Sequence, residues 1–190
     1  FVMESTQGKR LDEFQYSVLM QRPNRIAAML RKLEGGVTVI SDGRNLYKHV
    51  AAIRQYSVDP APKVLDHTLN GPAFREDDLF GWVLSTLDAL ASPDPRAALL
   101  DGADRVELVA SVDGAAEGQQ QLRIRHGRFI AEFWINPGAT PSIAKLRVDL
   151  SALMPNVRIL LNAVFRNWKF NPDLKANQFA FVAGPNDAKV

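Results

Sequence analysis

The stretch VTVISDGRNLYKHV, residues 37–50, decides how this sequence folds. β-Branched and aromatic residues lie on both sides of Asp42-Gly43, and an Asp-Gly pair suits a two-residue type I′ loop because both central residues need positive φ. The strands on either side would contain Val37, Val39, Leu46 and Tyr47. An Asp close to His49 would also suit a catalytic site, but an aspartate in a turn is the more economical interpretation. We therefore predict a tight hairpin in which Asp42 has no catalytic role.

The composition is that of a globular domain with a substantial core. The chain has 190 residues, of which 46% are hydrophobic and 23% are charged, and this length predicts a single domain over residues 1–190. Lys and Arg exceed Asp and Glu by only two (23 against 21), so the charge gives no reason to expect a nucleic acid partner. Cysteine is absent, which excludes thiol nucleophiles, disulfides and thiolate metal sites.

The sequence carries no recognisable targeting segment. No apolar run approaches the ~20 residues of a transmembrane helix. The opening FVMESTQGKRLDEF has neither an initiator Met nor the regions of a signal peptide. We expect a mature form or an excised fragment.

Working outward from the hairpin, the alternation of apolar and polar residues predicts further strands. Residues 14–20 alternate with period two. The segment RIAAMLRKL (25–33) has helical propensity, but it is confined between Pro23 and Gly35-Gly36, so we predict a strand. Strand patterns resume at Arg105 and continue to a last strand, QFAFVA (178–183).

A helical insert separates the two groups of strands, at about residues 63–101. Within it, apolar residues at helical spacing predict a helix over 77–90, with Asp77 and Asp78 at its N-terminal end and Pro93 beyond its C-terminal end. The apolar arc is wide, so this helix needs cover on more than one side. The expected fold is mainly β (α+β): a strongly curved antiparallel sheet that wraps a few helices.

Several short motifs resemble those of a known family. The segments QRPNR, SDGRNLYKHVAAIRQYSVDPAP and FRNWKFNPDLKANQFAFVAGPNDAKV are similar to exported bacterial proteins of the outer-membrane lipoprotein-sorting (LolA/LolB/LppX-like) superfamily, and most of all to an uncharacterised branch described as a domain of unknown function. The matching positions are Arg22-Pro23, Asp42-Gly43, Leu46-Tyr47, Tyr56, Ala61-Pro62, Phe179, Phe181 and Pro185. One departure is that the first helix of the family is missing or ends before Phe1.

This resemblance implies an incomplete β-barrel whose apolar interior takes acyl chains. It also implies a periplasmic or otherwise extracytoplasmic location, and in some relatives a thioredoxin-like domain follows. The motifs consist of turn and strand-end residues, so they specify a fold more than a function.

The polar residues form no recognisable catalytic or metal motif. His49, His67 and His126 lack metal-ligand spacing, and no Gly-x-Ser-x-Gly motif is present. The acidic stretch REDDLF is explained by a helix N-terminus. Arg123, Arg125 and Arg128 are typical of the solvent face of a sheet, with an acidic partner or a lipid headgroup as the alternative. We expect no enzyme activity, no metal and no cofactor.

The aromatic and methionine residues support the main functional hypothesis, a binding protein that holds an acyl chain or a lipoprotein in a half-barrel cavity. Peripheral contact with a membrane is compatible with this hypothesis. Adaptable Met side chains and aromatic rings suit such a lining, and the predicted lining residues are Tyr16, Met20, Met29, Phe80, Trp82 and Phe133. The alternative is a structural or interaction module with a filled core that serves a neighbouring domain.

Overall fold

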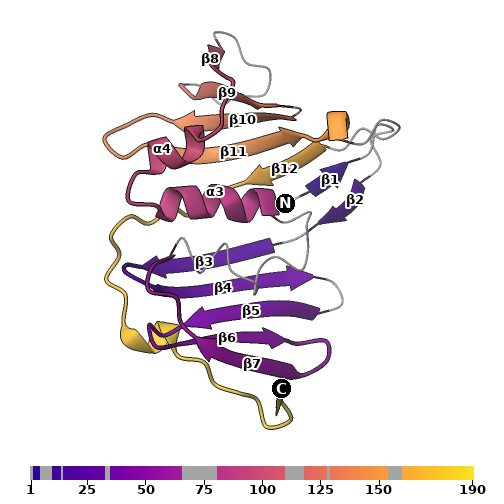
Figure 1. The fold of residues 1–190 in the computed structure, drawn as a ribbon, viewed down its shortest axis with the longest axis vertical. Helices are drawn as coiled ribbons and strands as arrows, with labels where there is room; N and C mark the ends of the chain where they lie inside the picture. Colours follow the sequence, from indigo (N-terminus) through magenta and orange to yellow (C-terminus); the bar gives the residue numbers. More distant parts are fainter. Residues whose placement is uncertain are drawn as a thin grey trace. The chain divides into compact units, whose positions relative to one another are not determined.

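The strands of the protein form two sheets that belong to two compact units. The computed structural model describes residues 2–4, 10–13, 15–32, 35–65, 81–109, 118–127, 129–153 and 160–190. Unit 1 comprises Phe1–Glu13 and Leu100–Asn171, and unit 2 comprises Phe14–Leu99 and Pro172–Val190. Each unit is described by itself (Figure 1).

Unit 2 contains a six-stranded sheet built from a simple meander. Its strands run in the order β13-β7-β6-β5-β4-β3. The elements are β3 (Gln15–Gln21), β4 (Arg25–Lys32), β5 (Gly35–Ser41), β6 (Asn45–Val50), β7 (Gln55–Pro60) and β13 (Ala188–Lys189). The pairs from β3 to β7 are antiparallel, whereas the C-terminal β13 pairs with β7 in parallel. The strands predicted at 14–20 and 25–33 are therefore confirmed.

One face of this sheet carries the core of unit 2. The register places Tyr16, Leu30 and Val37 on one face, together with Met20, Ile26 and Ser41. Every residue of β3 to β7 that is fully buried lies on this face, namely Ile26, Ala28, Leu30, Val39, Ser41 and Leu46. We call it the apolar face, and it is lined by side chains that alternate along each strand, as a half-buried antiparallel sheet requires.

Unit 1 contains a seven-stranded sheet in the order β2-β1-β12-β11-β10-β9-β8. Its strands are β1 (Val2–Glu4), β2 (Arg10–Glu13), β8 (Arg105–Val109), β9 (Gln120–His126), β10 (Phe129–Asn136), β11 (Ser142–Asp149) and β12 (Leu160–Val164), and a short 3-10 turn η1 (Ser151–Leu153) follows β11. The core of this sheet contains Ile124, Phe133, Leu146, Val148 and Leu161. The two N-terminal strands were not predicted, because residues 2–13 show no sustained alternation.

The helix predicted over 77–90 is confirmed in its described part, from Gly81 onward. Helix α3 (Gly81–Ala91) ends just before Pro93, and α4 (Pro95–Leu100) follows it. Asp94 accepts a hydrogen bond from the Ala97 N–H at 2.9 Å and Pro95 opens the helix, which is the usual chemistry of a helix start. Residues 77–80 of the predicted helix lie outside the described residues.

Two expectations about the sheet need correction. Over the described residues neither sheet closes or curls strongly, so the expected single, strongly curved sheet is replaced by two open sheets in a mainly β fold. The helical insert interrupts the meander, so β3 to β7 pair with one another before it and β8 to β12 pair with one another after it. The terminal strands cross between these groups, because β1 pairs with β12 and β13 pairs with β7.

The expected last strand, 178–183, is also wrong. Residues Ala176–Phe179 form a 3-10 turn, η2, in which the Gln178 side chain accepts a hydrogen bond from the Lys175 N–H at 2.7 Å. Only Ala188–Lys189 joins the ladder. The alternation of Phe179 and Phe181 reflects packing against a sheet face rather than pairing at an edge.

Candidate functional site

Two of the six predicted lining residues share a surface. Tyr16 and Met20 lie on β3 opposite Leu30 and Ile26, and both belong to the apolar face. Their side chains are half-buried, whereas Ile26 is fully buried. The apolar face therefore ends at β3 in partly exposed side chains.

Met29 lies on the opposite face. It pairs with Ser17 on β3 and Thr38 on β5, and 39% of its surface is exposed. Its sulfur accepts a hydrogen bond from Arg31 Nε at 3.4 Å. Because successive side chains point to opposite faces of a strand, Met29 does not line the same surface as Tyr16 and Met20.

Of the other three predicted lining residues, Phe133 is the one whose side chain the structure describes. Phe80 lies outside the described residues, and Trp82 belongs to α3, where the structure does not describe its side chain. Phe133 belongs to the sheet of unit 1, where it lies opposite Leu122 and Leu146 and is 5% exposed.

Asn24 joins three turns at one end of the six-stranded sheet. Its Nδ2 donates to the carbonyl oxygens of Gly43 at 3.0 Å and Pro62 at 2.8 Å, and its own carbonyl accepts from Ser41 Oγ at 2.7 Å. The Arg22-Pro23 peptide bond before it is cis. The Arg-Pro, Asp-Gly and Ala-Pro motifs thus meet at one place, and sequence reasoning missed Asn24, which connects them.

Asp42 is a turn residue, as predicted, but the loop lies one position later. Ser41 pairs with Leu46 and the Asp42 N–H donates to the Asn45 carbonyl, so Gly43 and Arg44 are the central pair. Of these two only Gly43 has positive φ, at 96°, which matches the signs of a type II′ rather than a type I′ turn.

The Asp42 carboxylate is used within its own turn. Its Oδ1 accepts from the N–H groups of Arg44 and Asn45, both at 2.7 Å. Partial burial opposes its ionisation, but these backbone donors outweigh that effect and lower the pKa of Asp42. A carboxylate held in this way suits turn stabilisation rather than proton transfer near neutral pH.

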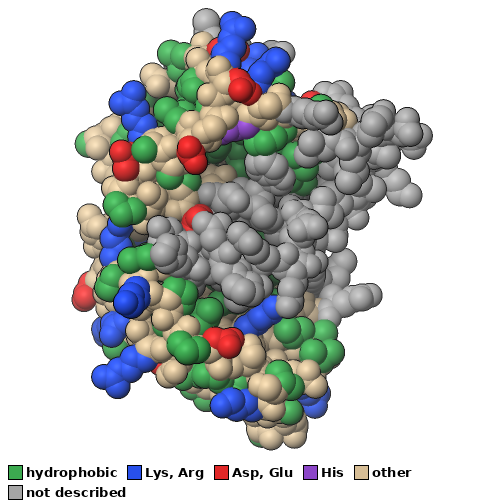
Figure 2. Space-filling model, viewed as in Figure 1, with side chains coloured by type: hydrophobic (Ala, Val, Ile, Leu, Met, Phe, Trp, Pro, Cys, Tyr) green, Lys and Arg blue, Asp and Glu red, His purple; other side chains and the backbone are tan. Residues whose placement is uncertain are grey.

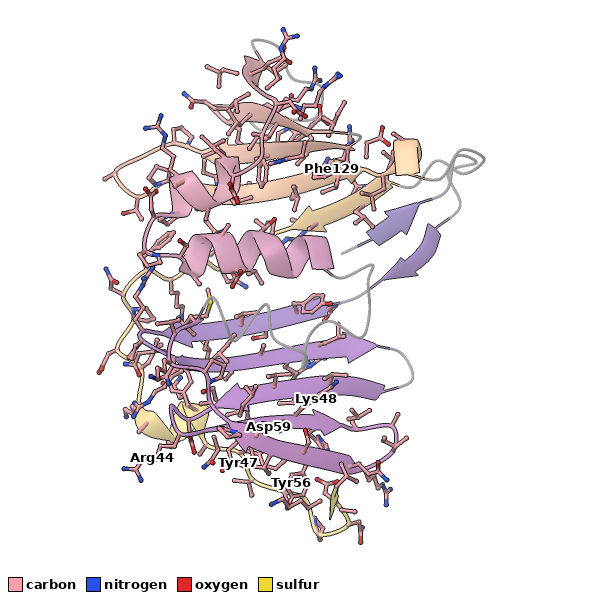
Figure 3. All side chains as sticks on the ribbon, viewed as in Figure 1. Arg44, Tyr47, Lys48, Tyr56, Asp59 and Phe129 are labelled. Atoms are coloured by element: carbon pink, nitrogen blue, oxygen red, sulfur yellow. The ribbon has the colours of Figure 1, made fainter. Side chains whose placement is uncertain are left out.

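An aromatic cluster covers the second face of the six-stranded sheet. Phe181 stacks on Tyr47 with ring centroids 5.0 Å apart, and it lies 5.1 Å from Tyr56 and 6.0 Å from His49. Tyr47 and Tyr56 come from the neighbouring strands β6 and β7 (Figure 3). Phe179, two residues before Phe181, is 1% exposed. The tyrosine and phenylalanine motifs of the sequence therefore act together in packing.

His49 and Asp187 form a pair beside this cluster. His49 Nε2 lies 3.2 Å from Asp187 Oδ2, which also accepts from the Gly184 N–H at 2.7 Å. The Gly184 N–H lowers the pKa of Asp187; desolvation opposes this effect, and His49 adds to it. The pair anchors the C-terminal segment, whose backbone continues the contact through the Val190 N–H bond to the Tyr56 carbonyl at 3.0 Å.

The other histidines show no metal-site arrangement. His126 stacks on Phe129 with centroids 5.1 Å apart, and His67 lies outside the described residues. Among the side chains that the structure describes, no group of three or more His, Asp or Glu residues is placed to hold a metal ion.

The arginine-rich strands of unit 1 form a face of mixed charge. Arg123 donates to Glu132 Oε1 from Nε at 3.0 Å and from Nη2 at 2.8 Å, and Arg147 lies 3.7 Å from Glu132. Arg105 and Arg125 are directly opposite each other on β8 and β9. Arg128 lies outside the described residues. Basic and acidic side chains are interspersed at the end of this unit that carries β8 (Figure 2), which agrees with a solvent face.

Trp134 is an unexpected buried residue on the same charged face. It is 1% exposed, with Lys145 Nζ 4.6 Å and the Arg147 guanidinium 5.5 Å from its ring. Long basic side chains can cover an aromatic ring in this way because their methylene stems are apolar and their charge is attracted to the ring face. In the sequence Trp134 alternates with Phe133 and Ile135 just as Glu132 does, so a period-two pattern does not predict its burial.

Comparison with known proteins identifies the family. The family model described as "Predicted periplasmic protein (DUF2092)" matches residues 4–190. The chain belongs to this family. Its description confirms the extracytoplasmic location expected from the sequence, and it agrees with the resemblance to an uncharacterised exported branch. No curated protein matches the chain.

Membership in DUF2092 does not assign an activity to this chain. The family description names a compartment, the periplasm, and no reaction or ligand. None of the described helices is long and apolar enough to cross a membrane.

Proposed function

We propose that this DUF2092 protein is a non-catalytic periplasmic binding protein that holds an acyl chain against the apolar face of its six-stranded sheet. The proposal rests on one observation: side chains on this face are mostly buried on β4 and β5 but only half-buried on β3. Ile26 and Val39 are 0% and 2% exposed, while Tyr16, Val18 and Met20 on β3 are half-buried. An apolar surface that reaches a partly exposed margin offers a place for a chain to lie.

The energetics of such binding need only a modest surface. Each buried methylene contributes roughly 0.8 kcal/mol, so several methylenes suffice for useful affinity. Recognition of this kind tolerates different chain lengths and needs no metal or cofactor. The resemblance to lipoprotein carriers supports the same proposal, and within it the acyl chain belongs to a lipid or to a lipoprotein.

The two methionines on opposite faces allow a matched test. The chain has no native cysteine, so Met20→Cys and Met29→Cys each introduce one labelling site for a polarity-sensitive dye. Added palmitic acid should shift the emission of the Met20→Cys conjugate to the blue and leave the Met29→Cys conjugate unchanged. Circular dichroism of both conjugates controls for folding. Equal responses, or none, would count against the apolar face as the site.

An interaction module is the second candidate, and one observation favours it. The C-terminal segment is fixed to the sheet by the Phe181 cluster, by the His49–Asp187 pair and by the Val190–Tyr56 hydrogen bond. An attachment this rigid would hold a neighbouring domain in one orientation. If the purified protein contains no lipid by native mass spectrometry and its melting temperature does not rise with added lipid, this candidate replaces the first.

A further inference from the structure

Among the described side chains of the apolar face, Lys48 is the basic one. Lys48 on β6 lies between Val39 on β5 and Ser57 on β7 in the register, so it shares the face of the buried Val39 and Leu46. Its side chain is half-buried. An ammonium group on such a surface is costly to desolvate unless it has a polar or charged partner.

Asp59 is the charged neighbour on the same face. Leu46 pairs with Asp59 and Lys48 pairs with Ser57, so Lys48 and Asp59 are diagonal neighbours on adjacent strands (Figure 3). Diagonal neighbours are ~7–8 Å apart, within reach of a long side chain. Unlike Lys48, Asp59 is exposed.

Lys48 and Asp59 lie on β6 and β7, beside the described uncharged side chains of β3 to β5. Among the side chains that the structure describes on this face of β3, β4 and β5, all are uncharged: Tyr16, Val18, Met20, Ile26, Ala28, Leu30, Val37, Val39 and Ser41. Counting only the described side chains, which leave out Lys32 on β4, the face has an uncharged part on β3 to β5 and a charged part on β6 and β7. This division matches the two parts of an amphiphile, a chain and a head group.

We propose that Lys48 is the anchor for the head group of an anionic amphiphile, a single-chain carboxylate or phosphate. This inference rests on the proposed function, because it uses the same face. The three donors of a lysine ammonium suit a point-like contact with either anion. Asp59 is an acidic diagonal neighbour of Lys48, so its negative charge would weaken the binding of an anionic head group there.

The test compares ligands that differ only in the head group. Palmitic acid, hexadecyl phosphate and hexadecanol, each below its aggregation concentration, are titrated into the wild-type protein and into Lys48→Met, Asp59→Asn and Lys63→Met. Lys63 is exposed, and its variant controls for the loss of one positive charge. Circular dichroism verifies that each variant is folded.

The expected result is a head-group preference that depends on Lys48. The wild type should bind the two anions at least about tenfold more tightly than hexadecanol, as a charge-assisted hydrogen bond allows. Lys48→Met should remove this preference and keep hexadecanol binding, Asp59→Asn should increase it, and Lys63→Met should leave it unchanged. The tighter of the two anions identifies the head group.

Each contrary result has its own meaning. Equal binding of acid and alcohol by the wild type, or a preference that survives in Lys48→Met, overturns the role of Lys48 while the apolar face remains a binding site. Absence of binding by all three ligands overturns the proposed function itself, and the head-group inference with it.

Discussion

The side-chain amide of Asn24 donates a hydrogen bond of 3.0 Å to the carbonyl oxygen of Gly43, in a turn nineteen residues away. The same nitrogen reaches the Pro62 carbonyl at 2.8 Å. Two hairpin turns and the segment after β7 are therefore held together by one half-buried side chain. Three of the motifs by which the sequence resembles its family, Arg22-Pro23, Asp42-Gly43 and Ala61-Pro62, meet at this end of the sheet.

Replacement of Asn24 tests this connection. Asn24→Ala removes both donor contacts and leaves two partly buried carbonyl groups without this partner, which should lower the free energy of unfolding by about 1–3 kcal/mol. Urea unfolding followed by circular dichroism measures the loss. Asn177→Ala, at an exposed position of η2, is the matched control and should change stability by less than about 0.5 kcal/mol.

Gly43 should be sensitive to a β-branched substitution. Its φ is 96°, and a Cβ added there would lie 3.3 Å from Asn24 Oδ1. Gly43→Val should therefore destabilise the protein by about 1 kcal/mol or more, because valine resists positive φ. Gly43→Asn should cost less, since asparagine tolerates this region better. Thermal unfolding of the two variants gives the comparison, and equal melting temperatures would refute the conformational argument.

Phe179 should contribute strongly to the stability of unit 2. It is 1% exposed, whereas Val182, three residues later, is 84% exposed. Phe179→Ala should cost ~3–5 kcal/mol, as is typical for a buried phenylalanine, and Val182→Ala should cost almost nothing. Denaturant unfolding measures both. Limited proteolysis should also cut the C-terminal segment faster in Phe179→Ala than in Val182→Ala.

Asp187 should contribute to stability in a pH-dependent way. Its pKa is lowered from the ordinary value of 3.8, first by the Gly184 N–H and then, against the effect of desolvation, by His49. The unfolded chain therefore binds a proton more readily than the folded one, so this contribution is complete above pH 3.8 and is lost as the pH falls through the folded pKa.

Asp187→Asn removes this titration. The variant should melt at a lower temperature than the wild type near neutral pH, and the difference should shrink as the pH falls below about 3.8. Melting curves across the acidic range measure it. Asp173→Asn, at an exposed position, controls for the loss of one carboxylate. If the two melting temperatures differ by the same amount at every pH, Asp187 contributes through its packing and not through its charge.

The strands were predictable where local pattern and packing agree. Residues 25–32 form β4 although their propensity is helical, because Pro23 and Gly35 leave room only for a short element and Ile26, Ala28 and Leu30 supply one apolar face. The hairpin was also predictable, but its central pair was not. The Asp42 carboxylate caps the N–H groups of Arg44 and Asn45, and this moves the turn to Gly43-Arg44.

The site was less predictable, because the identity of an aromatic or methionine residue does not indicate which face of a sheet its side chain occupies. Met20 and Met29 look alike in the sequence, and only the register separates them. Phe179 and Phe181 alternate as strand residues do, yet they pack onto a sheet from a 3-10 turn and the extended chain after it. Lys48 went unnoticed because its position on an apolar face depends on the pairing of three strands.

The division of unit 2 into Phe14–Leu99 and Pro172–Val190 has a consequence for how a periplasmic chain acquires its structure. A chain that crosses the inner membrane from its N-terminus delivers Tyr47 and Tyr56 long before Phe181. The aromatic surface formed by these two tyrosines stays open to other proteins during that interval, and such surfaces are prone to wrong association. A chain that lacks residues 172–190 should therefore expose the two tyrosines that Phe181 contacts in the complete fold.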